Sequence, residues 1–274
     1  MNSKDLVTEY SLRPNRALGQ NFLIDEAAIG RIVSLAAEPG LPVLEIGPGL
    51  GALTFPLAET GLRIAAVELD GALAKILTDR LPANARVVNR DFLKTDLNEV
   101  HAYLGGGDIA AAGNLPYYIT SDIVMRLIAS KLPIRRMVIM TQREAAERFF
   151  AKPGDKNYMP LSVLSQRFFD LSSAFELSPD MYWPQPDVSS SVTVFGRNGV
   201  EYDEGFPRFL KCAFAMRRKT LANNLAALGL KRAEAAELIE KAGLEPTVRA
   251  EALSVDALSS LYALFKAKNP SFSK

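Results

Sequence analysis

Cysteine, histidine and long apolar runs are scarce in this chain of 274 residues. The single cysteine, Cys212, excludes an internal disulfide and a cysteine-rich metal cluster, and the single histidine, His101, leaves little material for any other metal site. We therefore expect a protein without a metal, in which imidazole carries no chemistry. We interpret His101 as a surface residue and Cys212 as a small apolar packing residue.

Long hydrophobic segments are also missing. No stretch approaches the roughly 18 consecutive apolar residues of a spanning helix, and Lys4, Asp5 and Glu9 stand where a signal peptide would be apolar. The sequence therefore predicts a soluble, cytoplasmic protein without a membrane partner. The formal net charge is only +1, so affinity for a nucleic acid has to come from an uneven distribution of charge.

Short apolar runs alternate with helical stretches through the first half of the chain. They predict strands at residues 43–46, 64–69, 87–89, 109–112 and 137–141. Such alternation is typical of an α/β fold with a parallel sheet covered on both faces. Two later runs, 171–177 and 190–195, have no long helix between them and predict an antiparallel pair at the sheet edge.

The pattern becomes purely helical toward the C-terminus. Residues 206–228, 232–242 and 255–267 show helical periodicity, and Ser254 is placed to cap the last helix. We therefore expect a catalytic domain over residues 1–200 and a small helical domain over residues 201–274, which the length allows.

Residues 43–51 predict a buried strand that runs into a glycine loop, VLEIGPGLG. Gly47, Gly49 and Ala52 satisfy the spacing of the dinucleotide fingerprint, and an acid, Glu68, lies about twenty residues further on. The loop alone therefore does not identify its ligand. A second acid, Glu45, precedes the loop, where it disfavours a pyrophosphate.

A third acid, Asp91, follows the next strand. Three acids at successive strand ends suit a ligand that has a cationic centre and no phosphate, and S-adenosylmethionine is such a ligand. Glu68 is expected to accept hydrogen bonds from the ribose hydroxyls, Asp91 from the adenine amino group, and Phe92 to offer an apolar surface. The alternative for either acid is a solvated strand end or a helix cap.

The residues Asn114-Leu115-Pro116-Tyr117 follow the run 109–112. A proline after Leu115 keeps that residue out of helical geometry, while Asn114 adds a side-chain acceptor and Tyr117 a ring for stacking. This corner suits an enzyme that holds a flat base with an exocyclic amine. The same residues are also compatible with an ordinary turn that closes a strand.

Four motifs together resemble a known family. They are RPNRALGQNFLID at 13–25, EIGPGLG at 45–51, GNLPYYIT at 113–120 and FAMRRKTLANNL at 214–225. They resemble the ribosomal RNA adenine dimethyltransferases, in particular those of the bacterial small subunit, over nearly the whole chain. The resemblance implies a Rossmann-like class I methyltransferase sheet, mostly parallel with one antiparallel edge strand. It also implies dimethylation of two adjacent adenines near the 3′ end of 16S rRNA, and a role in small-subunit biogenesis.

The resemblance places Asn21 and Leu23 in an N-terminal lid segment, residues 1–25, that touches the cofactor. For catalysis we expect the Asn114 side-chain oxygen and a backbone carbonyl at Leu115 or Pro116 to hold the two hydrogens of the adenine amine. Positioning and polarisation then supply most of the rate. Tyr117 is expected to stack on a base extruded from the RNA.

Further RNA contacts are expected from a proline-rich loop and from clustered cations. Tyr182 occupies the family's aromatic position in that loop, although Asp187 stands where the family usually has lysine. The cations chosen as candidate substrate contacts are Arg143, Arg217, Arg218 and Lys219. We expect the last three to lie within a helix.

Rival functions share these motifs. Erm-type enzymes modify a single adenine of 23S rRNA, and a non-catalytic ribosome assembly factor could keep the same fold. A DNA adenine methyltransferase would more often have aspartate in place of Asn114. No symmetric apolar face or heptad is visible, so the chain is expected to act as a monomer.

Overall fold

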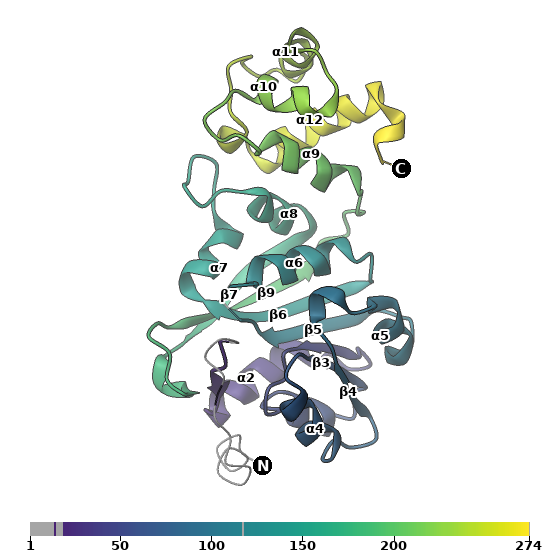
Figure 1. Ribbon diagram of the computed structural model, residues 1–274, viewed down its shortest axis with the longest axis vertical. Helices are drawn as coiled ribbons and strands as arrows, with labels where there is room; N and C mark the ends of the chain where they lie inside the picture. Colours follow the sequence, from purple (N-terminus) through teal and green to yellow (C-terminus); the bar gives the residue numbers. More distant parts are fainter. Residues whose placement is uncertain (1–13, 15–18, 117, 274) are drawn as a thin grey trace. The chain divides into compact units, whose positions relative to one another are not determined.

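The computed structural model describes residue 14, residues 19–116 and residues 118–273 (Figure 1). The described chain forms two compact units. The first joins the N-terminal part, up to Ala146, with Asp170–Arg197, and the second joins Glu147–Phe169 with Asn198–Lys274. Residues 147–169, which lie within the catalytic domain expected from the sequence, thus group with the C-terminal helices.

A seven-stranded sheet forms the centre of the first unit (Figure 1). Its strand order is β4 (Ala85–Asn89), β3 (Ile64–Glu68), β2 (Val43–Ile46), β5 (Ile109–Asn114), β6 (Ile134–Gln142), β9 (Ser190–Arg197) and β7 (Phe169–Leu177). The strands from β4 to β6 pair in parallel, and β9 runs antiparallel to β6. The antiparallel strand therefore lies one position in from the edge, which β7 occupies.

Helical segments precede and connect these strands. They are α2 (Glu26–Ala36), α3 (Thr54–Glu59), α4 (Gly71–Thr78), η2 (Phe92–Lys94), α5 (Leu97–Leu104), α6 (Thr120–Ala129) and α7 (Arg143–Phe150). Asp25, Asp70 and Asp96 cap α2, α4 and α5 by accepting from backbone N–H groups of the first turn. All residues of β2 and β3 are buried, because a parallel sheet is covered on both faces.

Gly113 determines how closely β2 and β5 approach at their carboxyl ends. It pairs with Ile46, and a Cβ atom added to it would lie 2.5 Å from the Ile46 carbonyl oxygen. Only glycine fits this position without a shift of the backbone. The close approach brings the start of the glycine loop beside Asn114.

The second unit is helical. Its elements are α8 (Pro160–Phe168), α9 (Gly205–Ala213), α10 (Leu221–Leu225), η4 (Ala226–Leu228), α11 (Arg232–Lys241), η5 (Ala250–Ala252), α12 (Val255–Lys268) and η6 (Pro270–Ser273). Phe209 packs in its core against Tyr262 and Phe265. Ser254 caps α12 through a bond from the Ala257 N–H, as the sequence predicts.

The prediction of one long helix over residues 206–228 is wrong. The structure breaks it between α9 and α10, and Arg217, Arg218 and Lys219 lie in the intervening turn. The buried Asn224 side chain supports the turn, because its Nδ2 donates to the carbonyls of Ala213 and Met216 and its Oδ1 accepts from the Met216 N–H. One side-chain amide thus replaces the helical bonds that are lost.

A small two-stranded antiparallel sheet joins segments far apart in the sequence. β1 (Phe22–Leu23) pairs with β8 (Tyr182–Trp183), which follows η3 (Pro179–Met181) in the proline-rich loop. Phe22 and Trp183 stack with ring centroids 6.4 Å apart. The N-terminal segment that carries Asn21 and Leu23 is thereby fixed against the loop after β7.

The remaining expectations concern membranes and metals. Among the described helices, none is long and apolar enough to cross a membrane. His101 lies in α5, where its Nε2 bonds the Gly107 carbonyl, and Cys212 is partly buried in α9. Within the same described residues, no group of three or more histidine, cysteine or acidic side chains is arranged to hold a metal.

Candidate active site

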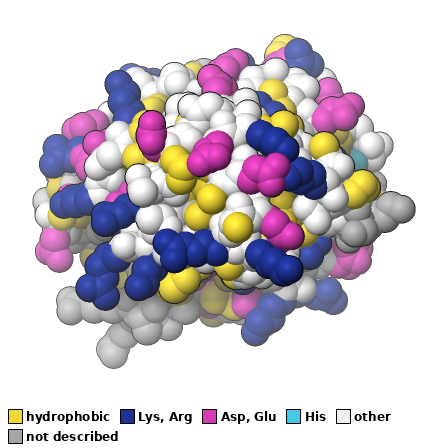
Figure 2. Space-filling model, turned by 90° about the horizontal axis from the view of Figure 1, so that it is seen from above, with side chains coloured by type: hydrophobic (Ala, Val, Ile, Leu, Met, Phe, Trp, Pro, Cys, Tyr) yellow, Lys and Arg dark blue, Asp and Glu magenta, His cyan; other side chains and the backbone are white. Residues whose placement is uncertain are grey.

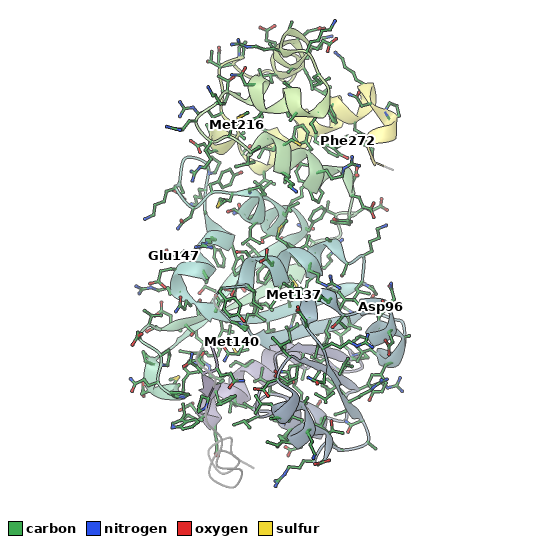
Figure 3. All side chains as sticks on the ribbon, viewed as in Figure 1. Asp96, Met137, Met140, Glu147, Met216 and Phe272 are labelled. Carbon is green, nitrogen blue, oxygen red and sulfur yellow. The ribbon has the colours of Figure 1, made fainter. Side chains whose placement is uncertain are left out.

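A pocket opens at the carboxyl ends of the parallel strands in the first unit. All the residues expected to bind the cofactor line it: Asn21, Leu23, Glu45, Gly47, Gly49, Glu68, Asp91, Phe92 and Asn114. Pro116, which follows β5, and Met140, which belongs to β6 and is labelled in Figure 3, also line it. Ligands of open α/β sheets bind at this end of the strands, so the topology brings these residues together.

The glycine loop leaves β2 in a conformation that favours glycine. Gly47, Gly49 and Gly51 have φ angles of 65°, 58° and 79°, which place them in the left-handed region. The Gly49 N–H is held by Glu68. A Cβ on Gly51 would approach the Phe55 ring to 2.6 Å, so the third glycine serves the packing of the loop onto α3.

Glu68 ends β3 as a buried carboxylate with only 6% of its surface exposed. Its Oε2 accepts from the Gly49 N–H at 3.0 Å and its Oε1 from the Asp70 N–H at 2.8 Å. Burial raises the pKa of Glu68, and these two bonds oppose the rise. The Leu69 N–H is a third backbone donor that lowers this pKa, and the carboxylate, with about four acceptor positions, keeps room for a ligand.

Glu45 is even more deeply buried in β2, at 2% exposure. Burial raises its pKa to about 8, with a smaller opposing effect of the nearby Thr54 hydroxyl and a further increase from the charge of Glu68. Its Oε2 finds no hydrogen-bond partner among the described residues. In the ligand-free protein Glu45 therefore keeps its proton near neutral pH, and a ligand that brings positive charge would favour its carboxylate form.

The third acid follows β4. Asp91 caps η2 through a bond from the Leu93 N–H to Oδ1, and its Oδ2 lies 3.6 Å from the exposed ammonium of Lys94. Phe92 is 5% exposed and lines the pocket. The helix-cap alternative for Asp91 is thus realised, and the cap still leaves an oxygen for a ligand.

Asn114 ends β5 beside the glycine loop. Its Nδ2 donates to the Asn21 carbonyl at 2.9 Å. Because a carbonyl can only accept, this bond fixes which end of the carboxamide is nitrogen and directs Oδ1 elsewhere. Asn21 therefore orients Asn114 from the N-terminal segment.

The turn after Asn114 carries two backbone carbonyls, those of Leu115 and Pro116, that the sequence offered as acceptors. The Pro116 carbonyl accepts from the Ile119 N–H at 3.2 Å and from the Thr120 hydroxyl at 3.0 Å, so it serves the start of α6. The Leu115 N–H donates to the Met140 carbonyl at 3.0 Å, which ties the turn to β6. Of the two residues considered from the sequence as backbone acceptors, Pro116 lines the pocket with a carbonyl that is already bonded twice, whereas Leu115 is 1% exposed and is not among the described lining residues.

The candidate substrate residues are not all brought together. Tyr117 lies outside the described residues. Tyr182 is 3% exposed and packs in the hydrophobic core with Leu23 and Leu177, so in this arrangement its ring offers no face to a base. Arg143 is exposed at the start of α7.

The basic triplet belongs to the second unit. Arg217 donates to the Glu251 carboxylate at 2.8 Å and to the Lys156 carbonyl at 2.9 Å. In the described chain no ion pair engages the side chains of Arg218 and Lys219, which are exposed. Within the triplet, Arg217 thus has a structural role, whereas Arg218 and Lys219 are exposed and could contact a ligand.

Several lining residues escaped the sequence reasoning. Leu50, Leu53, Ile119 and Ile123 provide apolar walls, and Tyr118 lines the pocket while 59% exposed. Gln20 donates to the Asp70 carboxylate at 2.9 Å, which fixes the N-terminal segment to the start of α4. Because Gln20 and Asp70 are 50 residues apart, no local signal in the sequence indicates this contact.

The pocket residues fit S-adenosylmethionine better than a dinucleotide. Apart from Tyr118, the ionisable residues that line the described pocket are three acids and one arginine, Arg90, and acids in their charged form would repel a pyrophosphate. The buried, unpaired oxygen of Glu45 suits a cation, and the remaining acceptor sites of Glu68 suit a diol.

Comparisons with known proteins identify relatives of this chain. A family model described as ribosomal RNA adenine dimethylase matches residues 12–267. The ribosomal RNA small subunit methyltransferase A of Clostridioides difficile (strain 630) is 37% identical over 276 residues, which cover 97% of this chain and 96% of that protein. The protein of the same name in Geobacillus thermodenitrificans (strain NG80-2) is 38% identical and covers 94% and 93%.

Solved structures share the α/β class I methyltransferase fold. A dimethyladenosine transferase from Plasmodium falciparum superposes with a TM-score of 0.74 at 21% identity, covering 90% of this chain and 98% of that one. The 23S rRNA methyltransferase ErmE gives a TM-score of 0.63 at 25% identity, with coverage of 89% and 98%. From the family model and the near full-length relatives, the chain belongs to the ribosomal RNA adenine dimethylase family.

Proposed function

We propose that this protein transfers methyl groups from S-adenosylmethionine to N6 of two adjacent adenines near the 3′ end of 16S rRNA. Each adenine would receive two methyl groups, and the reaction would form part of small-subunit biogenesis. Membership of the family supports the reaction, and the small-subunit name of the relatives supports the substrate.

The observation that carries the proposal is the orientation of the Asn114 carboxamide. With Nδ2 bonded to the Asn21 carbonyl, Oδ1 is the end available to an incoming amine. Together with the Leu115 carbonyl it would accept the two N6 hydrogens of adenine and so expose the nitrogen lone pair. Acceptors that are already fixed in place cost no reorganisation during the reaction.

The donor side is assigned to the three acids and the glycine loop. When bound, S-adenosylmethionine supplies an electrophilic methyl group. Glu68 would accept from its ribose hydroxyls, Asp91 from its adenine amine beside the Phe92 ring, and Glu45 would offset its positive charge. Asn21, Leu23, Gly47 and Gly49 would complete the walls.

Proton transfer needs no strong base. Methylation turns the amine into an ammonium group that is acidic enough to lose its proton to water. Asn114 and Leu115 can only accept hydrogen bonds at their oxygens, so they would position the amine and polarise it.

RNA contacts are proposed for both units. Tyr117 would stack on the target base, and Arg143 would contact phosphates near the first unit. Arg218 and Lys219 would do so from the second unit, with Arg217 holding their turn. A stacking role for Tyr182 would require it to leave the core in which it is packed. We also propose that the protein acts as a cytoplasmic monomer.

One experiment tests the proposal. Purified protein, labelled S-adenosylmethionine and small subunits from cells that lack the modification are incubated, and the labelled nucleotides are mapped. We expect label on two neighbouring adenines near the 3′ end of 16S rRNA. The fold shared with ErmE makes 23S rRNA the second candidate substrate, so label confined to large-subunit RNA would select that activity, and no label on either RNA would support a non-catalytic role.

A further inference from the structure

One arginine of the first unit contacts the turn that is proposed to hold the adenine of the methyl donor. Arg126 lies on α6, and its two terminal nitrogens donate to the carbonyls of Leu93 and Thr95. Its guanidinium carbon lies 6.0 Å from the centroid of the Phe92 ring. The arginine therefore touches η2, the turn that presents Asp91 and Phe92 to the pocket.

The turn has little stability of its own. η2 is a single turn of three residues. Its internal support consists of the Asp91 cap, the bond from the Thr95 hydroxyl to the Asp91 carbonyl, and two backbone bonds, from the Lys94 N–H to the Asp91 carbonyl and from the Thr95 N–H to the Phe92 carbonyl. Short 3₁₀ segments have poor hydrogen-bond geometry, and carbonyls at a helical end need outside donors. Arg126 supplies donors to two such carbonyls at once, as its planar fork allows.

The arginine is not fully satisfied at this position. Its Nε is buried and has no partner among the described residues, so part of the cost of burying the charge is not recovered. An apolar residue would avoid that cost but would leave the Leu93 and Thr95 carbonyls without these two donors. A fixed orientation of the turn is what the arginine adds.

The same helix begins at the acceptor turn. The Ile119 N–H and the Thr120 hydroxyl donate to the Pro116 carbonyl, and Ile119 and Ile123 line the pocket. α6 is thus bonded at its start to the turn that carries Leu115, and through Arg126 to the turn that carries Asp91. Within the first unit it links the two halves of the site.

We infer that Arg126 is a positioning residue for the adenosine part of the methyl donor, acting through the η2 turn. The inference rests on the proposed function only for the identity of the donor. It places the effect of Arg126 on donor affinity, and specifically on the adenosine portion. The methionine portion and the RNA lie outside its influence.

The test measures binding of S-adenosylhomocysteine and of 5′-methylthioadenosine, which has the adenosine but no amino acid, by calorimetry. Arg126→Met is expected to weaken both ligands by the same factor, about tenfold, or about 1.4 kcal/mol. Arg126→Lys, which keeps the charge and one donor, should fall between. The rate at saturating donor should stay within about twofold of wild type, because the acceptor atoms are untouched.

Arg136→Met is the matched control. Arg136 also donates from a guanidinium to a backbone carbonyl, that of Leu35, at 3.1 Å, but it lies outside the pocket lining. It should change thermal stability and leave both affinities unchanged. If Arg126→Met does not fold, Arg126→Lys and its circular dichroism decide.

Unchanged affinity of the Arg126 variants, or a loss of rate without a loss of affinity, would overturn the inference. Failure of the proposed function has a different outcome: the wild-type protein would bind both adenosine ligands but transfer no methyl group to ribosomal RNA. In that case a weakened affinity of Arg126→Met still supports the positioning role.

Discussion

At the scale of single residues, the proposed reaction depends on one amide whose direction is set by another residue's backbone. Asn21 belongs to the N-terminal segment and Asn114 to β5, and the bond between them fixes the acceptor oxygen. The orientation of the proposed acceptor is therefore set partly by a segment outside the main sheet. The two deeply buried acids, Glu45 and Glu68, also make the stability of the ligand-free protein depend on pH.

Asn114→Ala should remove the side-chain acceptor. We expect the turnover rate to fall by about 10²–10³-fold, the range for one lost preorganised contact to the reacting group. The affinity for S-adenosylhomocysteine should change by less than about tenfold, since Glu68 and Asp91 remain. Single-turnover kinetics with small subunits, alongside calorimetry, separate the two quantities. A variant that turns over normally would contradict the acceptor role.

Glu45 should make the ligand-free protein less stable as pH rises. Its folded pKa, about 8, is above the ordinary value of 4.5, so between these values the unfolded chain has lost a proton that the folded chain retains. The free energy of unfolding therefore falls with pH across this window, by up to a few kcal/mol, and levels off above it. Glu68 contributes in the same direction because its pKa is also raised.

Glu45→Gln tests this dependence. The variant keeps the shape and cannot ionise, so its free energy of unfolding relative to wild type should rise from pH 5 to pH 8. Urea unfolding of the ligand-free protein at several pH values measures the difference. Glu38→Gln, at a partly exposed surface ion pair with Arg135, is the control and should show little change. A pH-independent difference for Glu45→Gln would contradict the buried-acid assignment.

At the scale of elements, the glycine loop between β2 and α3 has two roles: it lines the pocket, and its third glycine packs closely against α3. Gly51 and Gly61 both have left-handed φ angles, 79° and 80°, but an added Cβ meets the Phe55 ring at 2.6 Å only at Gly51 and has no heavy atom within 4 Å at Gly61. A comparison of alanine variants at Gly51 and Gly61 therefore separates the cost of backbone strain from the cost of a side-chain collision.

Gly51→Ala should therefore destabilise the protein more than Gly61→Ala. The shared left-handed strain costs about 1–2 kcal/mol, and overpacking at Gly51 should add about 1–3 kcal/mol. Chemical denaturation of both variants gives the comparison. Equal losses would mean that Phe55 moves aside without cost, and that the third glycine is required for its backbone conformation alone.

At the scale of the whole molecule, the parts predicted well from sequence are those in which local pattern and topology agree. The five parallel strands follow from apolar runs, and the rule that ligands bind at strand carboxyl ends brings Glu45, Glu68, Asp91 and Asn114 together. The β1–β8 pairing was not predictable, because Phe22 and Trp183 are far apart in the sequence and neither segment is longer than two residues. The break after Ala213 was missed because the amide that supports it, Asn224, lies eleven residues further on.

The charge of the second unit yields the last prediction. With a net charge of +1 for the whole chain, RNA affinity has to come from local clusters, and Figure 2 shows Lys and Arg side chains interspersed with Asp and Glu on the face it displays. Arg218 and Lys219 are exposed side by side in the turn after α9, and Arg217 supports that turn through Glu251. Two cations that contact phosphates should each release about one counterion.

The double variant Arg218→Ala/Lys219→Ala should weaken binding to small subunits and reduce the slope of log affinity against log salt by about 1.4 to 2, the value for two phosphate contacts. Arg232→Ala/Lys241→Ala, two cations of α11, is the charge-matched control. Filter binding at several salt concentrations measures both slopes, and S-adenosylhomocysteine affinity should be unchanged in each. If both double variants lose the same slope, the contribution is general electrostatic attraction and the turn after α9 makes no specific phosphate contact.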